Sequence, residues 1–262
     1  MKYFDTHAHY YDERFSEECE GGVDALLSDL FATNVSYIIN IGTSPQTSRL
    51  AIAQAKQYKN MYTALGIHPS DAQYLPDVDI ALEEIETLLR NSENKAVALG
   101  EIGLDYHYPD TNRTLQLEVF HRQMQMAQRL SLPVVIHDRE AHADCMEVIR
   151  QYPEVKGVFH SFSGSGEMAK DLVRLGYMIS FSGTVTFTNA RRVAEACQCV
   201  PRTHLLIETD APYLAPHPRR GTLNHSGNLV FTNAKIATLH GLSEEEAARI
   251  TEENAKRFFR IP

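Results

Sequence analysis

The sequence predicts a single TIM-like (β/α)8 barrel, and three observations lead to this fold class. The chain has 262 residues, near the typical size of one such barrel with its single large core. Short β-branched runs alternate with longer segments of helical period, which is the pattern of βα units around a parallel sheet. Polar residues gather where the strands are expected to end. We therefore expect one α/β domain over residues 1–262.

Eight short apolar segments are the predicted strands. They span residues 3–6, 35–41, 61–65, 96–99, 134–136, 157–159, 177–181 and 205–208. Because a helical segment follows each of them, closure into a barrel is the expected arrangement.

The segments between the strands carry helix starts and helix faces. Ser44 and Pro45 are a cap residue and a first-turn proline, and they predict a helix that runs to Tyr58. Ser243 and Glu246 stand at capping-box spacing before the last helix. Apolar residues share one face of the helix after the fourth strand: Leu117, Phe120, Met124 and Ala127. In the last helix the apolar side is formed by Ala247, Ile250 and Phe258.

Composition and charge exclude several classes of protein. Apolar residues make up 43% of the chain and charged residues 23%, which is ordinary for a globular protein and excludes disordered and fibrous classes. The net charge of −9 disfavours tight, sequence-specific DNA binding, which usually needs a basic face. No apolar run is long enough to cross a membrane, and residues 1–10 lack the pattern of a signal peptide, so we expect a cytoplasmic protein.

Residues 211–228 form the longest stretch without a helical or strand period. Its density of proline and glycine predicts a loop, directly after the eighth strand. A loop of this length in a compact barrel is more often functional than not.

Metal-binding side chains stand at the predicted ends of the strands. In a (β/α)8 barrel the carboxyl ends of the strands hold the active site, so these residues should converge. Alternation along a strand sends His7 and His9 to the same side. The set offers enough imidazole and carboxylate donors for two divalent ions, and one carboxylate such as Glu101 can bridge them. The proposed ligands are His7, His9, Glu101, His137, His160 and Asp210.

Six segments resemble the TatD family of metal-dependent deoxyribonucleases, within the amidohydrolase superfamily. They are FDTHAH (4–9), LGIHP (65–69), LGEIGLDY (99–106), PVVIHDRE (133–140), HSFSGS (160–165) and LLIETDAPYLAP (205–216). The resemblance covers nearly the whole chain. It implies a TIM-like barrel in which one ion is bound by His7, His9 and Asp210, the other by His137 and His160, and both by Glu101.

The resemblance also implies substrate contacts. His68 and Arg139 match active-site positions that would meet a substrate phosphate. Arg220, in the long loop, suits the same role because a planar guanidinium can donate two parallel hydrogen bonds to one phosphate. Tyr106 either stacks on a base or packs at the barrel rim.

One segment departs from the family pattern. Where the family has RNEP after an arginine-glycine pair, this chain reads Leu223, Asn224, His225 and Ser226. The departure changes substrate-side contacts and leaves every proposed metal ligand in place.

The expected reaction is phosphodiester hydrolysis by a water that two metal ions activate. Glu101 would hold the ions and Asp210 would orient or deprotonate the water. We expect DNA as the substrate, single-stranded or at strand ends, and neither a membrane nor an obligate protein partner.

Several alternatives stay open at this point. Zinc, manganese, iron and magnesium all fit mixed imidazole and carboxylate ligation. The same ligands would serve a hydrolase of small esters, lactones or amides, and RNA is an alternative to DNA. A non-catalytic metal-binding barrel is a more remote third reading, because degeneration normally removes some ligands.

Overall fold

The computed structural model of the protein describes residues 1–262. Its strands follow one another in one sheet in the order β1 to β8, and the paired neighbours run parallel. This is the strand order of a (β/α)8 barrel, so the predicted fold class is confirmed. The chain divides into two compact units, which are described separately below. The expectation of a single domain over the whole chain stays a prediction.

The first unit consists of Met1–Asn40, Ser161–Arg174 and Met178–Pro262. Its strands are β1 (Tyr3–Ala8), the larger part of β2 (Val35–Gly42), β7 (Met178–Phe181) and β8 (Leu205–Ile207). Its helices are α1 (Arg14–Glu18), α2 (Gly22–Thr33), α8 (Gly166–Arg174), α9 (Arg191–Cys199), α10 (Leu229–His240) and α11 (Glu244–Phe259). Short 3-10 turns complete it: η2 (Gly183–Thr186), η3 (Arg202–His204) and η4 (Ser226–Asn228).

In this unit β1 lies beside the segment that follows β8. Ala8 and Ala211 form a parallel bridge. The backbone N–H of Asp210 donates to the carbonyl of His7 at 2.9 Å, and that of His9 donates to the carbonyl of Ala211 at 2.7 Å. The first and last strands of the barrel are thus joined at their carboxyl ends.

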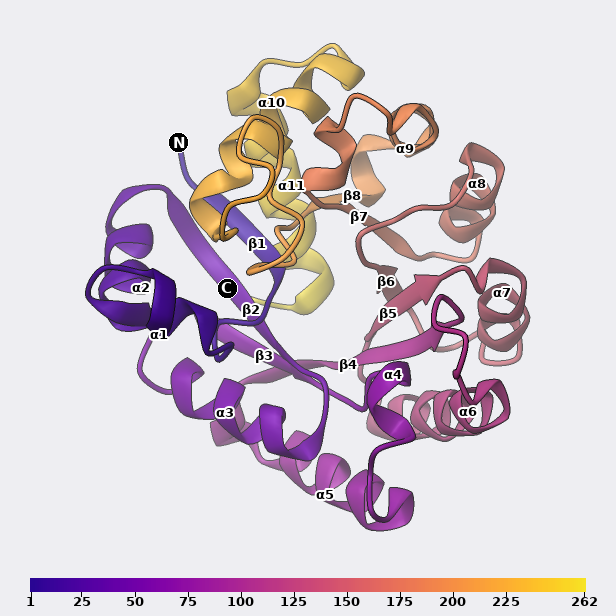
Figure 1. Ribbon diagram of the computed structural model, residues 1–262. Coiled ribbons are helices and arrows are strands. Elements are labelled where there is room, and N and C mark those ends of the chain that lie inside the picture. The colour runs from indigo at the N-terminus through magenta and orange to yellow at the C-terminus, as the bar shows by residue number, and fades with distance from the viewer. The chain divides into compact units, whose positions relative to one another are not determined.

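The second unit consists of Ile41–His160 and Leu175–Tyr177. Its strands are β3 (Met61–Leu65), β4 (Ala96–Asp105), β5 (Val134–Arg139) and β6 (Gly157–Phe159). Its helices are α3 (Pro45–Ala55), α4 (Pro69–Ala72), α5 (Val78–Arg90), α6 (Arg113–Leu130) and α7 (His142–Arg150), with the turn η1 (Ser92–Asn94). Helices α3 and α5 pack on β3, and α6 packs on β4 (Figure 1).

Four strands run past their predicted ends: β1 to Ala8, which takes in His7, β2 to Gly42, and by more residues β4 and β5, which corrects the expected position of two further site residues. β4 continues to Asp105 and β5 to Arg139, instead of ending at residues 99 and 136. Gly103 pairs with His137, and Asp105 with Arg139, so each strand supplies the hydrogen-bond partners of the other. Glu101 and His137 therefore lie within strands and not in the loops after them. The polar residues of these segments suggested loops, but pairing between the two strands extends the sheet.

The helix starts are confirmed, and two helix details are corrected. Ser44 caps α3, but the helix ends at Ala55 and not at Tyr58. Ser243 and the N3 residue of α11 form the expected capping box. The buried aromatic residue at the end of α11 is Phe259, whereas the sequence pattern favoured Phe258. In α6 the buried face includes Phe120, Met124 and Ala127, as predicted, whereas Leu117 is only half-buried.

Residues 211–228 contain no α-helix, as predicted, and only η4 at their end is regular.

None of the helices is both long and apolar enough to span a membrane.

Candidate active site

The first unit brings together three proposed metal ligands: His7, His9 and Asp210. His7 lies in β1 and His9 directly follows that strand, so alternation directs both side chains to one side. Their Nε2 atoms are 3.2 Å apart. Oδ1 of Asp210 lies 3.5 Å from Nε2 of His7 and 3.4 Å from Nε2 of His9. The three side chains form one cluster, which we call the β1/β8 triad.

The spacing of the β1/β8 triad fits a single divalent ion. With metal–nitrogen distances of about 2.0 to 2.1 Å, neighbouring ligands of a tetrahedral ion lie about 3.3 to 3.4 Å apart. The three distances of 3.2, 3.5 and 3.4 Å fall around that value. Two imidazoles and one carboxylate are also a ligand set that suits divalent transition metals.

The backbone positions Asp210 against β1. Asp210 has φ of 59°, in the left-handed region that aspartate and asparagine tolerate better than most residues. Its N–H bond to the carbonyl of His7 ties this turn to the strand that carries the histidines. On the other side of the triad, the Tyr11 hydroxyl hydrogen-bonds Nδ1 of His9 at 3.1 Å and orients the ring.

Asp5 is buried beneath the triad and serves as a structural acceptor. The hydroxyls of Thr209 and Ser226 each donate to its Oδ2 at 2.6 Å. Its Oδ1 accepts the backbone N–H of Thr209 at 3.0 Å. Burial raises the pKa of Asp5 to about 6, although these hydrogen bonds act in the opposite direction. Asp5 therefore links β1 to the segment after β8.

The segment that departs from the family pattern is tied into this network. Ser226 is fully buried, and its hydroxyl also lies 2.7 Å from the Tyr10 hydroxyl. The side-chain amide of Asn224 donates to the carbonyls of Thr209 and Tyr213 at 2.9 and 2.7 Å. Asn224 holds the end of the long loop against the turn that carries Asp210, and Ser226 holds it against β1 and Tyr10.

The second unit brings together the other three proposed ligands: Glu101, His137 and His160. Oε1 of Glu101 lies 2.8 Å from Nδ1 of His137 and 2.8 Å from Nε2 of His160. The two histidine nitrogens are 3.1 Å apart. We call this cluster the β4–β6 triad. Its distances are those of hydrogen bonds, and its mixture of imidazole and carboxylate donors again fits a divalent transition metal.

Asp105, which the sequence pattern did not single out, supports the β4–β6 triad. Its Oδ2 lies 3.1 Å from Nε2 of His137, and its Oδ1 accepts the backbone N–H of His107 at 3.0 Å. A carboxylate behind a ligating histidine fixes the ring and its tautomer, which leaves Nδ1 to face Glu101. Burial alone would lower the pKa of His137, but its hydrogen bonds to Asp105 and Glu101 raise it. Asp105 stands four residues after Glu101 in β4, so strand alternation was the signal that could have found it.

Glycine at position 103 allows β4 to approach β5 beside His137. Gly103 has φ of 130°, and a Cβ at this position would lie 2.1 Å from the carbonyl oxygen of His137. No other residue fits this contact without moving the strand that carries the histidine. The second glycine of the LGEIGLDY motif thus has a direct structural role.

His68 lies beside the β4–β6 triad, with Nε2 near Glu101. It caps α4, where its Nδ1 accepts the backbone N–H of Ser70 at 3.1 Å. Burial lowers the pKa of His68 to about 3, so the ring is neutral. A neutral ring that accepts at Nδ1 carries its proton on Nε2, and this atom lies 3.5 Å from Oε1 of Glu101. His68 is therefore a hydrogen-bond donor that faces the cluster.

The other proposed substrate residues of this unit differ in their surroundings. Arg139 ends β5 with its side chain exposed, and its guanidinium lies 5.6 Å from the ring centre of Tyr108. The Tyr106 hydroxyl donates to Asp144 at 2.7 Å, and Arg113 lies 4.3 Å from the centre of the Tyr106 ring. These contacts favour the packing role of Tyr106 over base stacking. Tyr108, the exposed ring near Arg139, was not singled out from the sequence.

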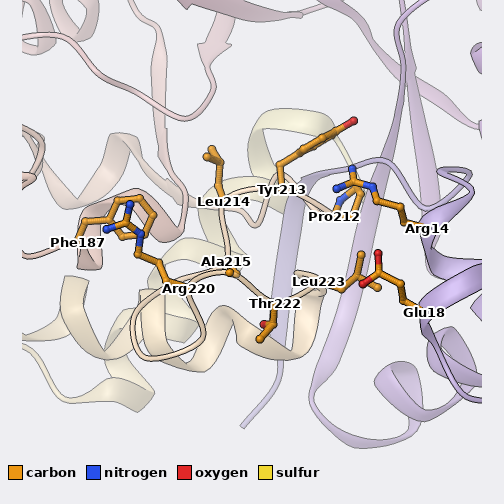
Figure 2. Close-up of a pocket in the computed structure, with 11 residues that line it drawn as sticks. Arg14, Glu18, Phe187, Pro212, Tyr213, Leu214, Ala215, Arg220, Thr222 and Leu223 are labelled. Atoms are coloured by element: carbon orange, nitrogen blue, oxygen red, sulfur yellow. The ribbon is translucent and has the colours of Figure 1, made fainter.

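Arg220 belongs to the first unit and lines a pocket formed by the long loop. Its guanidinium lies 4.4 Å from the ring centre of Phe187 (Figure 2). The substrate roles of His68, Tyr106, Arg139 and Arg220, and the ligand roles of the two triads, stay predictions from the sequence.

Comparison with known proteins supports the resemblance seen in the sequence. The profile of the family described as "TatD related DNase" matches residues 4–260. The chain belongs to the TatD family. It is 36% identical over 261 residues to YabD, an uncharacterized metal-dependent hydrolase of Bacillus subtilis. The matched region covers 98% of this chain and 99% of the relative.

Two further relatives come from Escherichia coli. The metal-dependent hydrolase YcfH is 35% identical over 259 residues, or 98% of this chain and 95% of the relative. The crystal structure of the TatD homologue YJJV superposes with a TM-score of 0.91 at 30% identity, over 99% of this chain and 98% of that one. The protein is therefore a metal-dependent hydrolase of the TatD family.

Proposed function

We propose that this TatD family protein is a deoxyribonuclease that hydrolyses phosphodiester bonds of DNA, single-stranded or at strand ends, with two divalent ions. The observation that carries the proposal is the pair of triads, each with two imidazoles and one carboxylate at hydrogen-bonding or ligand spacing. The family's description as a DNase supports the choice of substrate.

His7, His9 and Asp210 would hold one ion, His137 and His160 would hold the other, and Glu101 would serve both, as the resemblance implies. Bound divalent ions supply an activated water at neutral pH and stabilise charge on phosphoryl oxygens. The Asp210 carboxylate is the group that would orient this water or accept its proton.

Other residues would bind and orient the phosphodiester. His68 carries a proton on Nε2, is neutral, and can donate it to a phosphoryl oxygen. Arg139 is exposed at the end of β5 and offers a planar guanidinium to a neighbouring phosphate. Asp105 holds the imidazole of His137 in place while the substrate binds.

A hydrolase of small esters, lactones or amides is the second candidate. The net charge of −9 favours it, because a polyanionic substrate is repelled by an acidic protein. The same ligands would serve it, since two ions polarise a carbonyl as readily as a phosphoryl group. As for location, we propose the cytoplasm.

The deciding experiment compares substrates on metal-stripped protein resupplied with zinc, manganese, magnesium or ferrous iron in turn. The substrates are single-stranded DNA, duplex DNA, RNA, and a panel of small esters and lactones. We expect kcat/KM to be highest for DNA, with single strands preferred to duplex.

A contaminating nuclease is excluded by a parallel preparation of Asp210→Asn, which should lose the DNA activity. The proposal is overturned if a small ester or lactone is the better substrate while DNA cleavage stays at the level of the Asp210→Asn preparation.

A further inference from the structure

The long loop after β8 forms one wall of a pocket within the first unit. The cavity measures about 410 Å³, which is within the range of about 300 to 1,000 Å³ typical of small-molecule sites. Its walls come from α1, from the turn after β7 and from residues 212–215 and 220–223 (Figure 2).

The two ends of the pocket each carry a guanidinium laid over an aromatic ring. At one end Arg14 lies 4.4 Å from the ring centre of Tyr213. At the other end Arg220 lies 4.4 Å from the ring centre of Phe187. Figure 2 shows these pairs on opposite sides of Leu214. Flat aromatic and guanidinium surfaces are those on which unpaired nucleic acid bases stack.

The Tyr213 end adjoins the β1/β8 triad. The backbone N–H of Tyr213 donates to the carbonyl of Asp210 at 2.8 Å. The rings of Tyr213 and His9 meet edge to face, with centres 6.3 Å apart. A group bound beside Tyr213 therefore lies next to the atoms that would hold a metal ion.

Charge distinguishes the two ends. Arg14 is neutralised by Asp12, which it contacts through Nε at 3.0 Å and through a terminal nitrogen at 3.1 Å. The Tyr213 hydroxyl also donates to Asp12, at 3.3 Å, and the carboxylate of Glu18 lines this side of the pocket. Arg220 takes part in no ion pair, so its N–H groups are available to an anion. The pocket thus has a flat, net acidic end near the triad and a cationic end at Arg220, on the other side of Leu214.

We propose that this pocket binds the nucleotide directly attached to the scissile phosphate of an unpaired DNA strand. The base lies against Tyr213 and Arg14, and the next phosphate along the strand pairs with the Arg220 guanidinium. This inference rests on the proposed nuclease function and names a subsite of it. A duplex cannot present a stacked, paired base in this way, so the pocket selects single strands and strand ends.

Short substrates test the subsite through its distal phosphate. The thymidine dinucleoside monophosphate TpT has only the scissile phosphate, whereas pTpT and TpTp each carry one more, on opposite sides. In the metal-loaded enzyme we expect one of the two phosphorylated dimers to exceed TpT in kcat/KM by about 10- to 100-fold, as for a hydrogen-bonded charge pair. In Arg220→Ala this ratio should fall to about 1, and Arg220→Lys should retain part of it.

The matched control is Arg249→Ala, which removes the same charge from exposed α11, where Arg249 pairs with Glu253. It should keep the wild-type ratio. The subsite is overturned if neither phosphorylated dimer is preferred to TpT, or if Arg220→Ala and Arg249→Ala have equal effects.

A binding measurement separates failure of the subsite from failure of the nuclease proposal. Thymidine 3′,5′-bisphosphate should bind the protein in calorimetry, and Arg220→Ala should weaken binding by about tenfold or more. Tyr213→Ala should weaken it as well, whereas Tyr213→Phe keeps the ring and should bind normally. If the bisphosphate binds through Arg220 but DNA is not hydrolysed, the nuclease proposal fails and the pocket stands. Equal binding by wild type and Arg220→Ala overturns the pocket even if DNA is cleaved.

Discussion

Replacing Asp105 by asparagine should weaken metal binding without unfolding the protein. The carboxylate of Asp105 accepts two hydrogen bonds at once, from the backbone N–H of His107 at 3.0 Å and from Nε2 of His137 at 3.1 Å. An asparagine side chain has a single acceptor oxygen, so its NH2 group must face one of these two donors. The variant keeps the shape of the side chain but loses one of the two bonds.

The size of the effect follows from the bond that is lost. A hydrogen bond to a charged group contributes about 1.5 to 3 kcal/mol, which corresponds to roughly 10- to 150-fold in affinity. Loss of a carboxylate behind a ligating histidine typically costs about 10- to 100-fold in metal affinity. We therefore expect the β4–β6 triad of Asp105→Asn to bind zinc about 10- to 100-fold more weakly than that of the wild type.

The assay is a zinc titration of metal-stripped protein against a chromophoric chelator. Asp144→Asn is the matched control, because it makes the same chemical change at a carboxylate that binds the Tyr106 hydroxyl and not a proposed ligand. Urea unfolding of both variants shows whether the fold is kept. Zinc affinity of Asp105→Asn within twofold of Asp144→Asn would refute the role assigned to Asp105.

Three further predictions concern the ligands and the strand that carries them. Asp210→Asn should keep the left-handed turn and lose roughly 10²- to 10⁴-fold in kcat, and metal content measured alongside shows whether lost metal explains the loss. If Glu101 serves both ions as expected, Glu101→Ala should retain less metal per protein than His160→Ala, and equal ratios would contradict the shared role. Gly103→Ala should destabilise the protein by about 3 kcal/mol in urea unfolding, because its Cβ meets a carbonyl at 2.1 Å. Gly241→Ala, also at positive φ but with open space around it, should cost only about 1 kcal/mol.

The fold was predictable because the periodicity of hydrophobic residues is a local property. Eight strands of the expected type and order are present, and the capping signals at Ser44 and Ser243 mark real helix starts. The strand ends were less predictable. β4 runs to Asp105 because its polar end pairs with β5, and such pairing joins residues that are far apart in the chain.

The grouping of the candidate site residues was predictable from the geometry of the barrel. Residues near the carboxyl ends of parallel strands share one face, so His7 and Asp210 could be grouped although about two hundred residues separate them. The sequence did not reveal the contacts made by the long loop, because this segment has no helix or strand periodicity. Ser226 reaches Asp5, and Arg220 lies over Phe187, through a loop whose path follows no repeat.

The anchoring of the long loop has a consequence for how such enzymes diversify. Asn224 fastens its end to the turn that carries Asp210 and Ser226 fastens it to Asp5 of β1, while its tip, with Arg220, is exposed. A loop fixed at its base and open at its tip is a natural site for exchange between relatives, because a grafted tip leaves the ligand geometry untouched. Chimaeras that swap only residues 216–223 should therefore transfer substrate preference from one member of the family to another while metal affinity stays that of the host.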